Sequence, residues 1–188
     1  MKEADDLPAR AAGGDAEAFG RLMQATKSNL YRFVRRYVGD AEESYDLLQE
    51  TYAAAWLAIR RYDPERSFET WLRAIAINKC RDWSRRRRVR RWLLGAVDLD
   101  APQAMAAVDP TQDAYEDLVA AQTLSRLDRA ITDLPPQLKE PLLLTTIEAR
   151  SHAEAAAMLG VTVKAIETRV ARARRRLAQV LDPGGAQS

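Results

Sequence analysis

The chain has 188 residues, of which 47% are hydrophobic and 30% are charged, and its formal net charge is +2. This length allows one ordinary domain or two small ones with a buried core. The single Cys80 and the single His152 exclude an internal disulfide and a zinc site built from Cys and His, and we expect no cofactor. The polar N-terminus and the lack of a long apolar run predict a cytoplasmic protein without membrane insertion.

The N-terminal half is predicted to contain three helices. Apolar residues at spacings of three and four between residues 19 and 37 predict the first helix, and Gly39 ends it. Asp40 followed by Glu43 predicts a capping box for the second helix, in which the Asp side chain caps and the Glu side chain reaches back. That helix carries apolar residues as far as Ile59.

The third helix is predicted to begin at Ser67 or Thr70 and to run through Cys80 into a series of arginines. We interpret Cys80 as a small packed residue, with a redox or reactive role as the less favoured alternative. No segment alternates with a period of two, and no Asn-Gly or Asp-Gly hairpin turn occurs, so strands are not expected.

The middle of the chain loses this periodicity and is predicted to be an acidic, flexible linker. The sequence therefore predicts an all-α fold of two small helical domains. The predicted boundaries are an N-terminal tail at 1–14, a first domain at 15–92, the linker at 93–117, a second domain at 118–182 and a C-terminal tail at 183–188.

The distribution of charge follows these boundaries. Residues 78–91 carry a net charge of +7 and residues 163–180 carry +5, whereas residues 96–118 carry −6 without any lysine or arginine. Two basic blocks separated by an acidic segment form an organised pattern rather than a generic solvated surface.

The second domain is predicted to contain four helices. An apolar stripe at residues 124–134 predicts the first, which the two prolines at 135–136 end. The next helix is predicted at residues 138–147, with Pro141 tolerated near its first turn.

A helix-turn-helix is predicted at the end of the second domain. Ser151 and Glu154 have the spacing of a capping box that opens a short helix, Gly160 suits the left-handed residue that closes it, and Thr162 is placed to cap the last helix. That last helix has one apolar stripe and, on the opposite side, a basic face with small side chains, which suits the DNA major groove. The alternative is an ordinary amphipathic helix with a solvated basic face.

The basic block at residues 78–91 differs in kind because tryptophans accompany its arginines. Trp71, Trp83 and Trp92 lie in it or beside it. Aromatic rings stack on unpaired bases while cations follow the phosphate backbone, so the combination suits partly single-stranded DNA. The sequence leaves open the alternative that the tryptophans are core residues and the arginines a solvated surface.

Five stretches together resemble the extracytoplasmic-function group of bacterial sigma factors, which are specificity subunits of RNA polymerase. The stretches are residues 30–36, 46–52 with Trp56, 68–76, 78–82, and 134–137 leading into 154–161. Residues 87–92 and 163–167 are most similar to the metal-resistance subgroup. One departure is Ser44-Tyr45, where the family often has acidic residues.

The resemblance implies roles for three sets of residues. Docking to the clamp helices of the polymerase β′ subunit would involve Asp46, Leu47, Gln49 and Glu50. Capture and opening of the −10 element would involve Tyr62, Asp63, Arg66, Ser67, Trp71, Asn78, Lys79, Trp83, Arg85 and Arg86. Binding of the −35 duplex would involve Thr162, Lys164, Thr168, Arg169, Arg172 and Arg175. The two domains would then be sigma regions 2 and 4.

The resemblance also implies partners. These are core RNA polymerase, through its β and β′ subunits, promoter DNA in duplex and single-stranded form, and an anti-sigma protein that could hold the chain at the inner membrane. The main alternative is a helix-turn-helix regulator that binds duplex operator DNA without docking to polymerase. An enzyme is the least favoured hypothesis, because no phosphate-binding glycine loop, metal cluster or paired nucleophile and base is found.

Overall fold

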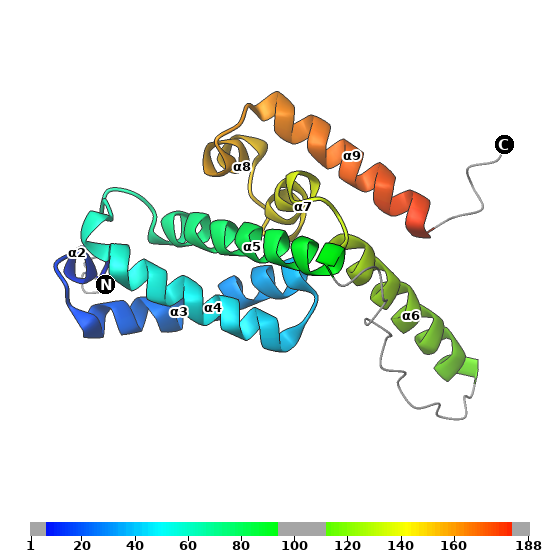
Figure 1. Ribbon diagram of the computed structural model, residues 1–188, viewed down its shortest axis with the longest axis horizontal. Coiled ribbons are helices and arrows are strands. Elements are labelled where there is room, and N and C mark those ends of the chain that lie inside the picture. Colours follow the sequence, from blue (N-terminus) through cyan, green and yellow to red (C-terminus); the bar gives the residue numbers. More distant parts are fainter. Residues whose placement is uncertain (1–6, 94–111, 182–188) are drawn as a thin grey trace.

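The computed structural model describes residues 7–93 and 112–181, and within these ranges all regular structure is helical (Figure 1). This confirms the predicted all-α fold. The first domain contains α2 (Leu7–Ala12), α3 (Ala16–Val38), α4 (Ala41–Ala58), η1 (Ile59–Arg61) and α5 (Phe68–Leu93). The second contains α6 (Gln112–Thr132), α7 (Pro136–Leu142), η2 (Leu143–Ile147), α8 (His152–Leu159) and α9 (Val163–Leu181).

The turn between α3 and α4 forms largely as predicted. Gly39 ends α3 in the left-handed conformation, with φ of 86°, and its N–H donates to the carbonyl of Arg35. Asp40 caps α4, since its side chain accepts the N–H of Glu43 at 2.9 Å. The predicted return bond from the Glu43 side chain is wrong: its carboxylate accepts the indole N–H of Trp83 at 2.8 Å instead.

The prediction of a tail at residues 1–14 missed helix α2. Leu7 and Ala11 are buried on this helix, which packs against α3 and η1. Arg10 then pairs with Asp15, the residue that caps α3. A single turn and a half with two buried residues is too short to produce a recognisable helical period in the sequence.

The helix predicted at residues 138–147 is interrupted. Helix α7 ends at Leu142, and the chain continues in the wider π-helical turn η2. Pro141 lies near the C-terminal end of α7, not in its first turn as predicted. Proline has no N–H to donate to the carbonyl four residues earlier, which weakens the α-helical ladder where the wider turn begins.

The linker is predicted to run to residue 117, but α6 already begins at Gln112. Residues 94–111, which include most of the acidic linker, lie outside the described residues.

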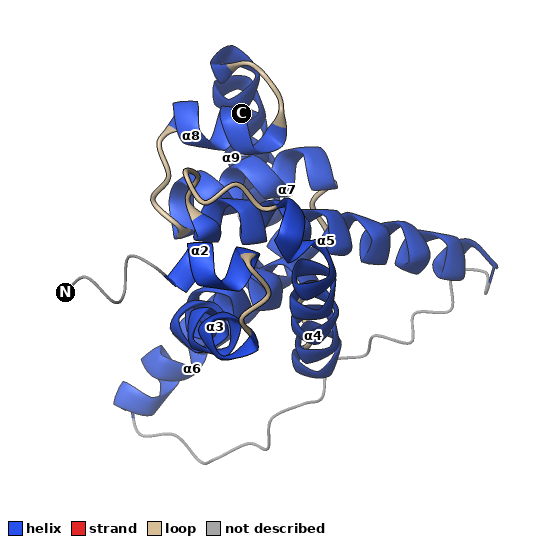
Figure 2. Ribbon diagram, turned by 90° about the vertical axis from the view of Figure 1, so that its left-hand side faces the viewer, coloured by secondary structure: helices blue, strands red, loops and turns tan. Residues whose placement is uncertain are grey.

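The two domains share one apolar core, which the sequence did not indicate. This core includes Phe33 and Ile77 of the first domain together with Leu143 and Leu144 of the second. In both views α5 lies between α3 and α4 on one side and α7, α8 and α9 on the other (Figures 1 and 2). A second cluster around Leu30 and other residues of α2 to α5 belongs to the first domain alone.

Candidate nucleic-acid interface

The helix-turn-helix forms as the sequence predicts. The Glu154 N–H donates to Ser151 Oγ at 3.2 Å, and the Ser151 N–H donates to the Glu154 carboxylate at 2.8 Å, which completes the capping box. Gly160 closes α8 in the left-handed conformation with φ of 65°. The Thr162 hydroxyl accepts the Ala165 N–H at 3.2 Å and so caps α9. These local bonds fix the angle at which α9 leaves the turn.

Helix α9 has two distinct faces. Its buried stripe consists of Ile166, Val170, Ala173 and Leu177, as predicted. The predicted −35 residues lie on the other side: Thr162, Lys164, Thr168, Arg172 and Arg175 are exposed, and Arg169 is half-buried. This face is therefore free to meet an anionic partner along its whole length.

The predicted −10 residues of α5 fall into two groups. Asn78, Arg85 and Arg86 are exposed, although Arg85 forms an ion pair with Asp82 on its own helix. Lys79 is half-buried and its ammonium lies 3.4 Å from the carboxylate of Glu50.

The aromatic side chains are less accessible than a stacking surface requires. Trp83 is only 8% exposed and belongs to the core that the two domains share. Tyr62 is 4% exposed, and its ring packs 5.0 Å from the half-buried ring of Trp71. For Trp83, and in part for Trp71, the structure therefore favours the alternative in which the tryptophans are core residues. Of the three tryptophans in or beside the basic block, Trp92 is the exposed one, at 81%.

The loop before α5 is ordered by short-range contacts. The Tyr62 hydroxyl donates to the Arg66 carbonyl, and Arg66 pairs with Asp63 at 3.5 Å. Ser67 Oγ accepts the Thr70 N–H at 3.4 Å, so Ser67 is the residue that caps α5. Burial raises the pKa of Tyr62 further above neutral, so its hydroxyl stays protonated and remains a donor. The predicted residues Asp63, Arg66 and Ser67 are exposed on this loop.

The acidic face of α4 lies beside the basic part of α5. Asp46, Gln49 and Glu50 are exposed, whereas Leu47 is 2% exposed and anchors α4 in the shared core. A groove of about 330 Å³ separates the two helices. Its walls carry Glu43, Asp46 and Glu50 on one side and Arg86, Arg87 and Arg90 on the other. The structure thus brings part of each predicted set to one groove, namely Asp46, Leu47 and Glu50 of the docking residues and Trp83 and Arg86 of the −10 residues. Glu43, Arg87 and Arg90 are additions to these sets.

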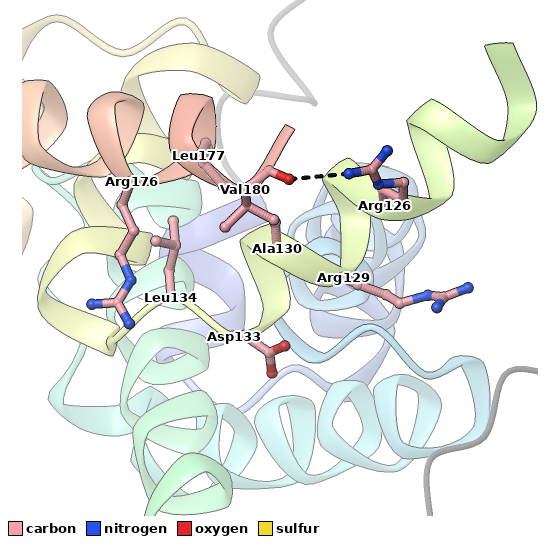
Figure 3. Close-up of a pocket in the computed structure, with 8 residues that line it drawn as sticks. All are labelled: Arg126, Arg129, Ala130, Asp133, Leu134, Arg176, Leu177 and Val180. Atoms are coloured by element: carbon pink, nitrogen blue, oxygen red, sulfur yellow. Dashed lines mark hydrogen bonds between the residues drawn. The ribbon is translucent and has the colours of Figure 1, made fainter. Parts of the chain in front are cut away.

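A second groove, of about 300 Å³, lies between α6 and α9 (Figure 3). Its apolar lining includes Leu134 and Leu177, and its charged lining consists of Arg126, Arg129, Arg176 and Asp133. Arg126 donates to the carbonyl of Val180 at 3.2 Å, which ties the C-terminal end of α9 to α6. No pattern in the sequence indicates this mainly basic groove, because Arg126 and Arg176 lie 50 positions apart on different helices and form no local motif.

Comparison with known proteins decides the family. The family models of Sigma-70 region 2 and Sigma-70 region 4 match residues 22–90 and 124–177. The RNA polymerase sigma factor CnrH of Cupriavidus metallidurans is 38% identical over 177 residues, which cover 94% of this chain and 93% of CnrH. The ECF RNA polymerase sigma factor SigC of Mycobacterium tuberculosis is 37% identical over 94% of this chain and 90% of its own length.

The chain belongs to the extracytoplasmic-function group of sigma factors. The solved structure of CnrH in complex with the cytosolic domain of CnrY agrees with this over 96% of the chain and 98% of CnrH, with a TM-score of 0.67 and 31% identity. Since CnrH is a metal-resistance sigma factor, the predicted subgroup resemblance is also supported.

Family membership gives the molecule its general function. This sigma factor directs core RNA polymerase to promoter DNA for the initiation of transcription. The match to region 2 over residues 22–90 supports this function rather than the alternative of a stand-alone operator-binding regulator, which needs no polymerase-docking domain. None of the described helices is long and apolar enough to cross a membrane. Within the described residues, no cluster of His, Cys, Asp and Glu is placed to hold a metal ion.

Proposed function

We propose that the sigma factor binds the −35 element through the exposed face of α9 and the −10 element through α5 and the loop before it. The observation that carries this proposal is the capped helix-turn-helix, whose last helix has a buried apolar stripe and an exposed basic face.

At the −35 element, the N-terminal residues of α9 would meet base edges in the major groove. Thr162, Lys164 and Thr168 are exposed there, and the Thr168 hydroxyl donates to the Lys164 carbonyl at 2.9 Å. The later side chains, Arg172 and Arg175, would contact phosphates. Phosphate contacts set the position of the protein and make binding salt-dependent, while base contacts give sequence specificity.

At the −10 element, the exposed Asn78, Arg85 and Arg86 would contact DNA directly. Extrusion of a base from the duplex costs a few kcal/mol, which contacts in the protein must offset. The half-buried ring of Trp71 and the loop at residues 62–67 would receive such a base. The buried Tyr62 and Trp83 would support this surface from beneath.

For polymerase docking, the acidic Asp46 and Glu50 and the neutral Gln49 are exposed on α4. Leu47 would act indirectly, because its buried side chain holds this face of α4 in place. Complementary charge across an interface mainly raises the association rate and the specificity of the complex.

We further propose that an anti-sigma protein restrains this chain, as the relative CnrH was solved in complex with the cytosolic domain of CnrY. A protein that acts on polymerase and chromosomal DNA belongs in the cytoplasm, and a membrane-bound anti-sigma protein would hold it at the inner membrane. All of these steps are non-covalent, so we propose no enzymatic activity.

The experiment that tests this function combines the purified chain with core polymerase on genomic DNA and sequences the 5′ ends of the transcripts. We expect starts that share a −10 and a −35 element and depend on the chain. Tight binding to a duplex operator without polymerase, together with no new transcript start, would overturn the proposal in favour of a stand-alone regulator.

A further inference from the structure

The arrangement of the two domains conflicts with simultaneous binding of both promoter elements. The elements are about 25 base pairs apart, which is roughly 85 Å of duplex at ~3.4 Å per base pair. At ~1.5 Å per residue, α5 and α9 span only about 39 and 28 Å. Yet Arg150, next to the helix-turn-helix, lies 3.3 Å from Glu69 on α5. On the proposed function, therefore, the domains must separate before both elements can be bound.

Glu140 makes the first group of ionic contacts between the domains. Its side chain is 4% exposed and comes from α7 of the second domain. Arg81 of α5 donates to both of its carboxylate oxygens, from Nε at 2.7 Å and from Nη2 at 2.5 Å. The hydroxyl of Tyr37 on α3 donates to the same carboxylate at 3.5 Å. Such two-pronged arginine–carboxylate pairs are the strongest type of ionic hydrogen bond in proteins.

Lys139 makes the second contact. Its ammonium is buried and donates to the carbonyl of Tyr37, at 3.0 Å, and to the carbonyl of Thr132. These carbonyls lie in the last turns of α3 and α6, one in each domain. A cation is favourable at the C-terminal end of a helix, so a single ammonium stabilises two helix ends and joins them.

Arg73 and Glu148 make the third contact. They form an ion pair between α5 and the end of η2, and their side chains are only 7% and 11% exposed. The Arg73 guanidinium also lies 4.8 Å from the centre of the Phe33 ring. Arg73 Nε and Nη1 and Glu148 Oε2 are nevertheless buried without a hydrogen-bond partner.

These contacts between the domains bury charged groups, whereas the interior of a protein that stays closed is mainly apolar. Burial removes each charge from water, and the partner returns only part of that energy, most clearly where polar atoms stay unsatisfied. When the domains separate, the charges regain their hydration, which lowers the cost of opening. Removal of one partner destabilises the closed form, because the other charge is left buried and unpaired.

We propose that the chain closes on itself without any partner through a polar latch, formed by Arg73 with Glu148, Arg81 with Glu140, and Lys139 with the ends of α3 and α6. In the closed form the two promoter-binding surfaces are exposed but belong to one compact body, too close together to span both promoter elements. Binding to core polymerase separates the domains, so that each surface reaches its own promoter element.

Small-angle X-ray scattering of the purified full chain, without polymerase or anti-sigma protein, tests the latch. We expect the wild type to be compact, and the double variant Glu140→Gln/Glu148→Gln to have a larger radius of gyration with unchanged helix content by circular dichroism. The matched control is Glu17→Gln/Glu65→Gln, which removes the same charge from two exposed side chains of the first domain. An extended wild type, or equal radii for the latch variant and the control, would overturn the proposal.

A charge exchange tests one pair directly. Glu140→Arg alone should expand the chain, and Arg81→Glu combined with it should restore part of the compaction. The absence of any restoration, with helix content intact, counts against the Arg81–Glu140 pair as a latch element.

Binding to core polymerase gives a readout of a different kind. If closed molecules cannot dock, the observed affinity is the affinity of the open form multiplied by the fraction of molecules that is open. Glu140→Gln/Glu148→Gln should then bind core polymerase severalfold more tightly than Glu17→Gln/Glu65→Gln, and equal affinities would show that the latch does not oppose docking. Scattering requires no polymerase, so a failure of the proposed function and a failure of the latch are distinguishable.

Discussion

The ammonium of Lys139 lies 3.0 Å from the main-chain carbonyl of Tyr37, a residue 102 positions earlier, and 4.5 Å from the centre of the Tyr37 ring. This contact joins the two domains at the point where α3 ends. Burial lowers the pKa of Lys139 from 10.5 to about 8, because the charged form loses most of its hydration. At neutral pH, the folded chain therefore loses some free energy of unfolding by keeping this buried ammonium charged.

We expect this cost to produce a characteristic pH dependence of stability. The pKa of Lys139 is lower in the folded chain than in the unfolded chain, so the unfolded chain binds more protons between pH 8 and 10.5, and this residue's contribution to stability rises with pH in that window. Over this window the free energy of unfolding should rise by at most about 3 kcal/mol through this residue. The variant Lys139→Met should lack this rise, and urea unfolding at a series of pH values would measure it.

The Cys80 thiol makes stability change with pH in the opposite direction, so its contribution must be separated from that of Lys139. Burial raises the pKa of its thiol from 9.0 to about 12, so the unfolded chain loses this proton first and stability falls above pH 9. The comparison of wild type with Lys139→Met at each pH removes this shared contribution. Parallel curves for the two proteins between pH 8 and 10 would contradict the expected role of Lys139.

The Cys80 thiol should be inert in the folded protein. Its side chain is completely buried, and its raised pKa leaves little thiolate, which is the reactive form. At pH 8 we expect iodoacetamide to modify Cys80 only after denaturation, as followed by intact-mass spectrometry. Rapid modification of the native chain would revive the redox role.

Replacement of Arg172 or Arg175 by Ala should weaken binding to the −35 duplex. Both side chains are exposed on α9, and neither belongs to its buried stripe, so stability should change by less than about 0.5 kcal/mol. Each lost phosphate contact should reduce the slope of log affinity against log salt by about 0.9. Titration of labelled promoter DNA with holoenzyme at several salt concentrations would measure it, and an unchanged slope would argue against this face of α9.

Asn78→Ala should impair promoter opening without affecting polymerase binding. Asn78 is exposed on α5. Loss of a base contact should reduce open-complex formation roughly tenfold, since such contacts contribute about 1–3 kcal/mol. Permanganate footprinting of unpaired thymines would detect this, and an equal loss of polymerase binding would point to misfolding.

Asp46→Arg should weaken association with core polymerase roughly tenfold or more, mainly by slowing association. The suitable comparison is Leu47→Ala, because Leu47 is buried beside it and should act through the stability of the fold. Surface plasmon resonance and thermal unfolding together separate the two: a slower association rate is expected for Asp46→Arg, and a lower melting temperature for Leu47→Ala. Wild-type association of Asp46→Arg would remove this residue from the docking surface.

The elements that depend on local bonds could be predicted from the sequence alone. The capping box of Ser151 and Glu154, the left-handed Gly160 and the buried stripe of α9 each involve residues within a few positions of one another. Propensity, capping and periodicity act over the same range, so the sequence determined the all-α fold, the helix-turn-helix and its basic face.

The contacts between distant segments were decided only by the tertiary structure. The sequence could not show that Trp83 bonds to Glu43, that Leu47 points into a core that both domains share, or that Lys139 lies against Tyr37. Trp83 and Glu43 are 40 positions apart, and Lys139 and Tyr37 are 102 apart. Such pairing depends on how preformed helices pack, since burial and ionic energy are gained only when both partners arrive. The sequence therefore determined the two promoter-binding units, and packing determined that they close on one another.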